Sequence, residues 1–294
     1  MTPPPAIRSA AERVLRLPPV LAARRVLDSY GAAGGGLLAG GLTYSAVFAI
    51  LPALLLIAGL VGLVVDDAGR RVAIVGGIGR ALPPLAGLVA NVLDRITEDA
   101  AGFGLLGLVG LAWGASHFYG SLDDAFGRIF RDAPRRSFVV RTVRGLLSVV
   151  LLVAVFVAAL ALTGVASYLA RETESALGDG SAVFWQIASP LLAGVVFVTA
   201  TIAIYRLVPA RRVPWRALLL PAVVVGVLLT LLTQLFTLIA PRLIGVASVY
   251  GAFVAVFAVM VWLSTGFQLL LVGAAWVRDR VVGGVTPDAP TAPR

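Results

Sequence analysis

The chain has 294 residues, of which 59% are hydrophobic and only 13% are charged, about half the charged fraction of an ordinary soluble domain. It contains no cysteine, which excludes disulfides, thiol nucleophiles and cysteine-ligated zinc or iron–sulfur sites. All 24 basic residues are arginines, which excludes lysine Schiff bases and the lysine of a phosphate-binding P-loop.

Residues 1–36 are predicted to form a cytoplasmic N-terminal arm. Within it, Ile7–Ser29 has apolar residues at helical spacing among five arginines. This pattern is typical of an amphipathic helix lying on the anionic cytoplasmic leaflet. The same composition also fits a partly disordered, arginine-rich arm, and both interpretations stay open.

Six apolar stretches follow, and five of them are long enough to cross a bilayer core of roughly 30 Å as helices. We therefore predict an all-α fold, a polytopic membrane bundle of six transmembrane helices over residues 37–278, followed by a disordered cytoplasmic tail over residues 279–294. The predicted spans are Leu37–Val65, Phe103–Tyr119, Gly145–Leu169, Val183–Tyr205, Ala217–Ala240 and Tyr250–Val277.

The arginines fall mainly on one side of these spans. With six crossings, 18 of them lie in the N-terminal arm, the 120–144 and 206–216 connections and the tail, against six on the other side. Because arginine-rich connections stay in the cytoplasm, both termini are expected there. The same asymmetry explains the net charge of +9 without a nucleic-acid partner.

The connection over residues 66–102 is the one long segment on the opposite side of the membrane. Its apolar stretches Ala73–Leu82 and Leu85–Ile96 are separated by Pro83-Pro84, which predicts two short helices at the outer interface. A seventh span, running through both stretches, is the competing interpretation. The proline pair and Arg80 disfavour it.

Polar residues of the first span form one candidate site. Thr43, Tyr44 and Ser45 are followed by Pro52, and a proline opens a backbone carbonyl that protein or water must satisfy. Either a kink here lines an internal cavity, or it serves helix packing with ordinary interhelical hydrogen bonds. Six glycines between positions 31 and 41 further predict that another helix approaches this span closely.

The densest polar group lies at the end of the second span. His117 is the only histidine, which excludes a metal site with several histidine ligands. Asp123 and Asp124 are adjacent, so a helix points them about 100° apart and they do not form a ready carboxylate dyad. The group serves either capping and salt bridges with Arg128 or Arg131, or the handling of a proton or a headgroup.

Two polar stripes carry glutamines. Gln234 shares one face of the fifth span with three threonines, and Gln268 follows Ser264 and Thr265 in the sixth. A glutamine in lipid must find a partner, so these faces are expected to point into the bundle. If they face each other, they line a polar cavity or join the two helices.

Four sequence motifs occur in a fixed order over residues 30–278. They are Gly41–Pro52, Ser121–Phe130, Tyr205–Pro209 with Val213–Arg216, and Ser248–Phe253 (which includes Tyr250) with Leu271–Ala274. Together they resemble the YihY/virulence factor BrkB family, which implies a six-span inner-membrane protein with cytoplasmic termini. Gly127 and Ala275 depart from the asparagine and glutamate common in that family, which puts any function of those two residues in doubt here.

We expect a protein of uncharacterised activity that transports or flips a lipid or other amphiphile, with a membrane scaffold or partner-binding protein of the cell envelope as the alternative. Envelope proteins or further copies of the chain are the expected protein partners. An enzyme is not expected; a ribonuclease is disfavoured because phosphodiester cleavage usually needs clustered carboxylates or histidines. We expect membrane lipids as partners and no cofactor. The candidate cavity or substrate-contacting residues are Thr43, Tyr44, Pro52, His117, Asp123, Asp124, Gln234, Tyr250 and Gln268.

Overall fold

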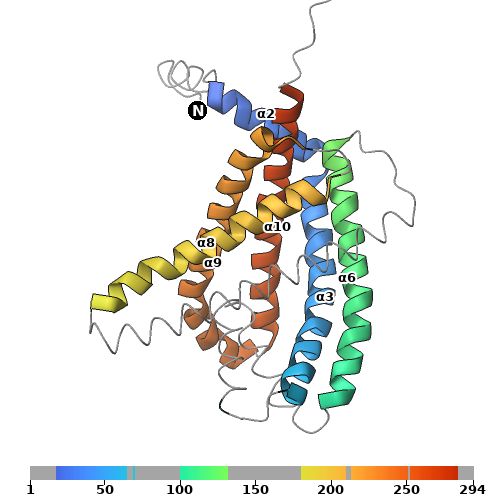
Figure 1. Ribbon diagram of the computed structural model, residues 1–294, viewed down its shortest axis with the longest axis vertical. Helices are drawn as coiled ribbons and strands as arrows, with labels where there is room; N and C mark the ends of the chain where they lie inside the picture. The colour runs from blue at the N-terminus through green and yellow to red at the C-terminus, as the bar shows by residue number, and fades with distance from the viewer. Residues whose placement is uncertain are drawn as a thin grey trace, which may run out of the picture.

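The computed structural model of the chain describes residues 18–64, 69, 100–131, 180–209, 213–250 and 252–283. All regular structure in these residues is helical (Figure 1), so the predicted all-α class is confirmed for the described part of the chain. The helices are α2 (Pro18–Ala32), α3 (Gly35–Val64), α6 (Ala100–Phe130), α8 (Gly180–Leu207), α9 (Trp215–Tyr250) and α10 (Ala252–Gly283).

Helices coincide with five of the predicted spans: α3 with the first, α6 with the second, and α8, α9 and α10 with the last three. The third predicted span, Gly145–Leu169, lies outside the described residues, as does nearly all of the 66–102 connection. In the described part, three segments are long and apolar enough to cross a membrane: Ala188–Leu207, Trp215–Ile239 and Val256–Gly283. A fourth is added if the bent pair α2–α3 counts as one span.

The bend between α2 and α3 is sharp. The two helices meet at 62°, and Gly34 at the corner has a φ of 70°, a left-handed conformation that glycine adopts without steric cost. Of the predicted amphipathic helix Ile7–Ser29, the structure describes only the part that belongs to α2. Val26 on α2 is buried against the bundle, and Arg25 forms a 3.9 Å ion pair with Asp279 of α10. α2 is thereby tied to the end of α10.

Several helices continue beyond the predicted boundaries. The expected connection over residues 241–249 is helical and belongs to α9, and α10 runs to Gly283. α6 continues through the charged residues after Tyr119 because its inner face keeps apolar side chains at helical spacing. Those side chains, Leu122, Ala125, Phe126, Ile129 and Phe130, are buried.

The helices pack as two pairs around α10. α3 lies along α6, α8 packs on α9, and α10 contacts α9, α3 and α6 (Figure 1). The two pairs come together at one end of the bundle, where the rings of Phe126 on α6 and Tyr205 on α8 are 6.2 Å apart. This end, which also holds α2 and the end of α10, is at the top of Figure 1.

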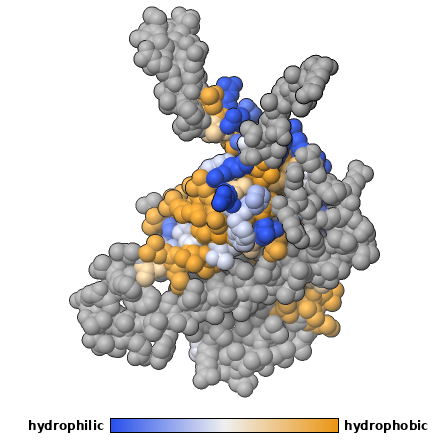
Figure 2. Space-filling model, turned by 45° about the horizontal axis from the view of Figure 1, so that its top comes forward, coloured by the Kyte–Doolittle hydropathy of each residue, from blue (hydrophilic) through white to orange (hydrophobic). Residues whose placement is uncertain are grey.

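Every charged side chain that the structure describes lies at this end, which we call the charged end. Figure 2 shows hydrophilic side chains gathered there, with hydrophobic side chains on the flanks below. The charged residues are Arg24, Arg25, Asp28, Asp123, Asp124, Arg128, Arg131, Arg206, Arg216, Arg278, Asp279 and Arg280. Away from this end, the side chains that the structure describes are uncharged, which suits helices in contact with lipid.

Candidate functional site

The seam between α3 and α6 contains Pro52. Three glycines of α6 line it, and a methyl group added to Gly110 would lie 2.9 Å from the Cβ of Pro52. A methyl group on Gly107 would collide with the backbone nitrogen of Leu56. The two helices thus touch along their backbones, in the manner typical of small residues in membrane bundles.

The third glycine, Gly114, covers the carbonyl that Pro52 leaves open. Because Pro52 has no N–H, the carbonyl of Phe48 four residues earlier lacks its helical donor. A methyl group on Gly114 would lie 3.0 Å from that carbonyl oxygen. At this position the opened carbonyl therefore faces the backbone of α6.

The polar residues next to Pro52 in the first span point in different directions. Thr43 is buried and its Oγ1 donates a 2.7 Å hydrogen bond to the carbonyl of Ala39, whereas Tyr44 is 58% exposed. The Oγ atoms of Ser45 and of Ser121 on α6 are 2.9 Å apart. Ser45 is therefore the member of this group that links the two helices.

On α6, His117 and Asp124 lie on one outer face and are about two turns apart. The His117 ring is exposed and is stacked on Trp113, with ring centroids 5.9 Å apart. Asp124 is exposed and Asp123 is half-buried, and both aspartates make interactions within the protein. The adjacent aspartates thus point to different surroundings, as helical spacing predicts.

The threonines of α9 satisfy their hydroxyl groups within their own helix. Thr230, Thr233 and Thr237 each donate a hydrogen bond of 2.9–3.0 Å to the carbonyl four residues earlier. Thr230 Oγ1 also lies 3.6 Å from where a Cβ on Gly194 of α8 would be. Gln234, one turn after Thr230, shares that side of α9 and is half-buried.

Gln268 is exposed and lies on another side of the bundle. Its Nε2 is 3.4 Å from Ser264 Oγ, one turn earlier on α10. A Cβ on Gly266 would lie 3.5 Å from the Leu229 side chain of α9, and Gln268 is about 160° away from Gly266 around the helix. α9 and α10 therefore meet through apolar residues, and the two glutamine stripes do not face each other. Tyr250 is the last residue of α9, and the structure describes only its backbone.

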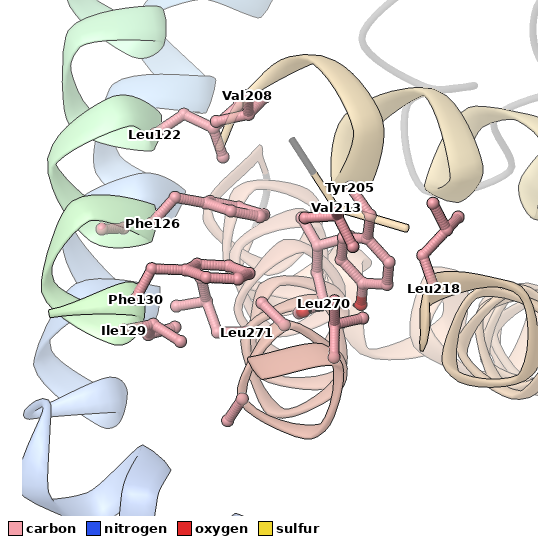
Figure 3. Close-up of a cluster of buried hydrophobic side chains, with 14 of the residues drawn as sticks. Leu122, Phe126, Ile129, Phe130, Tyr205, Val208, Val213, Leu218, Leu270 and Leu271 are labelled. Atoms are coloured by element: carbon pink, nitrogen blue, oxygen red, sulfur yellow. Dashed lines mark hydrogen bonds between the residues drawn. The ribbon is translucent and has the colours of Figure 1, made fainter. Parts of the chain in front are cut away.

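A cluster of buried hydrophobic side chains, which sequence reasoning had not singled out, lies at the charged end (Figure 3). Its centre is Tyr205, which is almost fully buried and whose hydroxyl donates a 2.7 Å hydrogen bond to the carbonyl of Leu270. The sequence signal was indirect: the motifs Ser121–Phe130, Tyr205–Pro209 with Val213–Arg216, and Leu271–Ala274 each supply residues to this cluster. Apolar side chains from α6, the α8–α9 turn, α9 and α10 belong to the same cluster: Leu122, Phe126, Ile129, Phe130, Val208, Val213, Leu218 and Leu271.

Arg206 holds the turn between α8 and α9 together. Its guanidinium donates a hydrogen bond to the carbonyl of Val213 and lies over the ring of Trp215, 5.1 Å from the ring centroid. Such cation–π contacts are favourable. The sequence shows an arginine near the end of one span and a tryptophan followed by an arginine at the start of the next. It does not show that the first arginine contacts the tryptophan.

The two departures from the family pattern sit in contrasting places. A Cβ on Gly127 would meet nothing within 4 Å, so a larger side chain has room there. Ala275 is completely buried in the cluster of the charged end. A glutamate at that position would therefore be enclosed by the bundle.

The chain matches the sequence profile of the family described as virulence factor BrkB over residues 26–289. It is similar to proteins named UPF0761 membrane protein, at 25% identity over 65% of this chain in Glaesserella parasuis and 26% over 83% in Alcanivorax borkumensis. A third, from Chromohalobacter salexigens, is 28% identical over 87% of this chain. The matches span 66%, 56% and 63% of these relatives, so the chain covers less than two thirds of their length. No solved structure matches the chain.

Proposed function

The chain belongs to the virulence factor BrkB family of membrane proteins, and from this premise we propose that it moves a lipid or other amphiphile between the leaflets of the bacterial inner membrane. We further propose six spans, with both termini in the cytoplasm. The arrangement of the described helices supports the number of spans, and one polar side chain on α10 supports the activity.

The ends of the helices support six crossings. α3 leaves the charged end and α6 returns to it, while α8 begins away from this end and finishes at it (Figure 1). A further crossing between α6 and α8 would connect these ends, and the apolar stretch Gly145–Leu169 has the length for it. α9 and α10 supply the last two crossings, and because α2 and the end of α10 lie at the charged end we place both termini on that side. Its arginines favour the cytoplasm.

The observation that carries the proposed activity is the exposure of Gln268. This residue lies near the middle of the apolar segment Val256–Gly283, where a polar side chain in contact with lipid is costly. Its one hydrogen bond to a described side chain is the 3.4 Å contact with Ser264, which leaves most of the carboxamide for water or for a polar ligand.

Apolar side chains continue the same face of α10. Phe257 and Val261 are exposed, and with Ser264 and Gln268 they follow one another at helical spacing along one side of the helix. One end of this stripe is thus apolar and the other is polar. An amphiphile matches this order, with its chains beside Phe257 and its headgroup beside Gln268.

The test is a lipid-movement assay with the full chain reconstituted in vesicles that contain fluorescent phospholipids. A membrane-impermeant quencher measures how fast lipid moves between leaflets. Gln268→Leu is expected to slow this movement several-fold relative to the unmodified chain. Gln234→Leu, the matched change on α9, should leave it nearly unchanged.

The proposal fails if the unmodified chain moves no phospholipid faster than protein-free vesicles do, or if Gln268→Leu has no effect. Size-exclusion profiles of both variants must match that of the unmodified chain. Absence of movement together with specific crosslinks from the charged end to envelope proteins would favour a scaffold instead.

A further inference from the structure

The turn between α8 and α9 presents a fixed arginine next to an exposed tryptophan. The bond from Arg206 to the carbonyl of Val213 uses one of the five N–H donors of the guanidinium, and the Trp215 ring covers one of its faces. Trp215 itself is 52% exposed. The guanidinium is thus held in place at the surface, with donors left for another acceptor.

A second arginine follows directly on α9. Arg216 is exposed, and it heads a row of apolar side chains that run down the same side of the helix at helical spacing. These side chains are each between 43% and 50% exposed: Leu219, Leu220, Val223 and Val227. A cationic group above an exposed apolar stripe matches an anionic headgroup above its acyl chains.

Among the described residues, no ion pair engages Arg206 or Arg216. The first turn of α9 has no acidic residue, and the turn itself adds Arg211 and Arg212 to the sequence. The ion pairs described at the charged end, Arg24 with Asp28 and Arg25 with Asp279, do not involve the arginines beside Trp215. The α8–α9 turn therefore keeps a net positive charge.

We propose that Arg206, Trp215 and Arg216 bind the phosphate of an anionic phospholipid, whose acyl chains lie along Leu219 and Val223. Planar guanidinium groups suit phosphate oxygens because they donate paired hydrogen bonds. Tryptophan is favoured at the depth of the headgroups. The apolar row below the arginines selects a lipid over a soluble phosphate. This site lies on α9, apart from the Gln268 face of α10, and it does not require that the bound lipid be transported.

The test uses the purified full chain in neutral detergent, with native mass spectrometry counting bound phosphatidylglycerol or phosphatidylcholine. Preferential binding of phosphatidylglycerol is expected. Arg216→Gln should weaken it about fivefold, because one arginine near an anionic headgroup contributes about 1 kcal/mol. Trp215→Leu should weaken it as well. The matched control is Arg24→Gln, which removes an exposed charge from the same end and should leave the affinity nearly unchanged.

Equal binding of the two lipids would overturn the proposal, as would an equal loss of affinity in Arg216→Gln and Arg24→Gln. Glycerol phosphate, the headgroup chemistry without acyl chains, separates a lipid site from a free-phosphate site. It should not displace phosphatidylglycerol at comparable concentration, and displacement would overturn the assignment to a lipid. Neither result depends on the lipid-movement assay, so this site and the proposed transport can fail separately.

Discussion

The phenol of Tyr205 on α8 donates a 2.7 Å hydrogen bond to the backbone carbonyl of Leu270 on α10. The phenol reaches the α10 backbone because Gly273, one turn away, has no side chain; a methyl group there would collide with the Tyr205 hydroxyl. On its other side the Tyr205 ring contacts Phe126 of α6. One side chain therefore joins three helices where the two helix pairs meet.

Replacing Tyr205 should separate the contribution of its hydroxyl from that of its ring. Tyr205→Phe keeps the ring and should lower the free energy of unfolding by about 0.5–1.5 kcal/mol, the usual net value of one hydrogen bond. Tyr205→Ala also leaves a cavity and should lower it by about 3–5 kcal/mol. Unfolding of the purified chain in mixed detergent micelles measures both. Equal losses in the two variants would show that the hydroxyl carries the whole effect.

Alanine substitutions at two glycines should have opposite effects. Gly107→Ala places a methyl group against the backbone of Leu56, so α3 and α6 must separate, at a cost of about 1–3 kcal/mol. A Cβ on Gly40 meets nothing within 4 Å. Gly40→Ala should therefore stabilise α3 slightly, by up to about 1 kcal/mol, through helix propensity. The same unfolding assay compares them, and a larger loss for Gly40→Ala would contradict the described seam.

Hydropathy located the helices well because it depends on local composition alone. An uncharged stretch of about 20 residues is required for a span whatever it packs against, and α3, α8 and α10 follow the predicted spans closely. The charge pattern was equally informative, since every described charged side chain lies at the end that the arginine count had marked.

Helix pairing could not be predicted in the same way. The glycines of the first span were expected to admit a close neighbour, yet Gly36, Gly40 and Gly41 face open space, and the close contact of this span is made by glycines of α6. A glycine permits another helix to approach closely, but the identity of that neighbour depends on how the whole bundle packs. Similarly, the helical spacing of polar residues around Gln234 and Gln268 predicted a polar stripe on each helix. It did not predict which neighbour each stripe faces. Leucines of α9, including Leu229, occupy the interface instead.

The ion pair between Arg25 of α2 and Asp279 of α10 should contribute little to the stability of the protein. Arg25 and Asp279 are 3.9 Å apart, but the Arg25 side chain is 68% exposed, and exposed ion pairs contribute at most about 1 kcal/mol. Arg25→Asp should reduce stability by a similarly small amount at low salt, and the reversed pair with Asp279→Arg should restore it. High salt should abolish the difference. A loss that persists in high salt and in the reversed pair would mean that Arg25 acts through packing.

The absence of cysteine makes the proposed orientation directly measurable, because a single introduced cysteine is the only thiol in the chain. Arg131→Cys lies at the charged end, after α6, and Ser181→Cys lies at the start of α8, away from that end. In intact spheroplasts a membrane-impermeant maleimide should label the cysteine at 181 and should reach that at 131 only after the membrane is permeabilised. The reverse pattern would place the arginines outside. Labelling of both positions in intact cells would mean that α8 does not begin on the far side, which removes the crossing assigned to Gly145–Leu169.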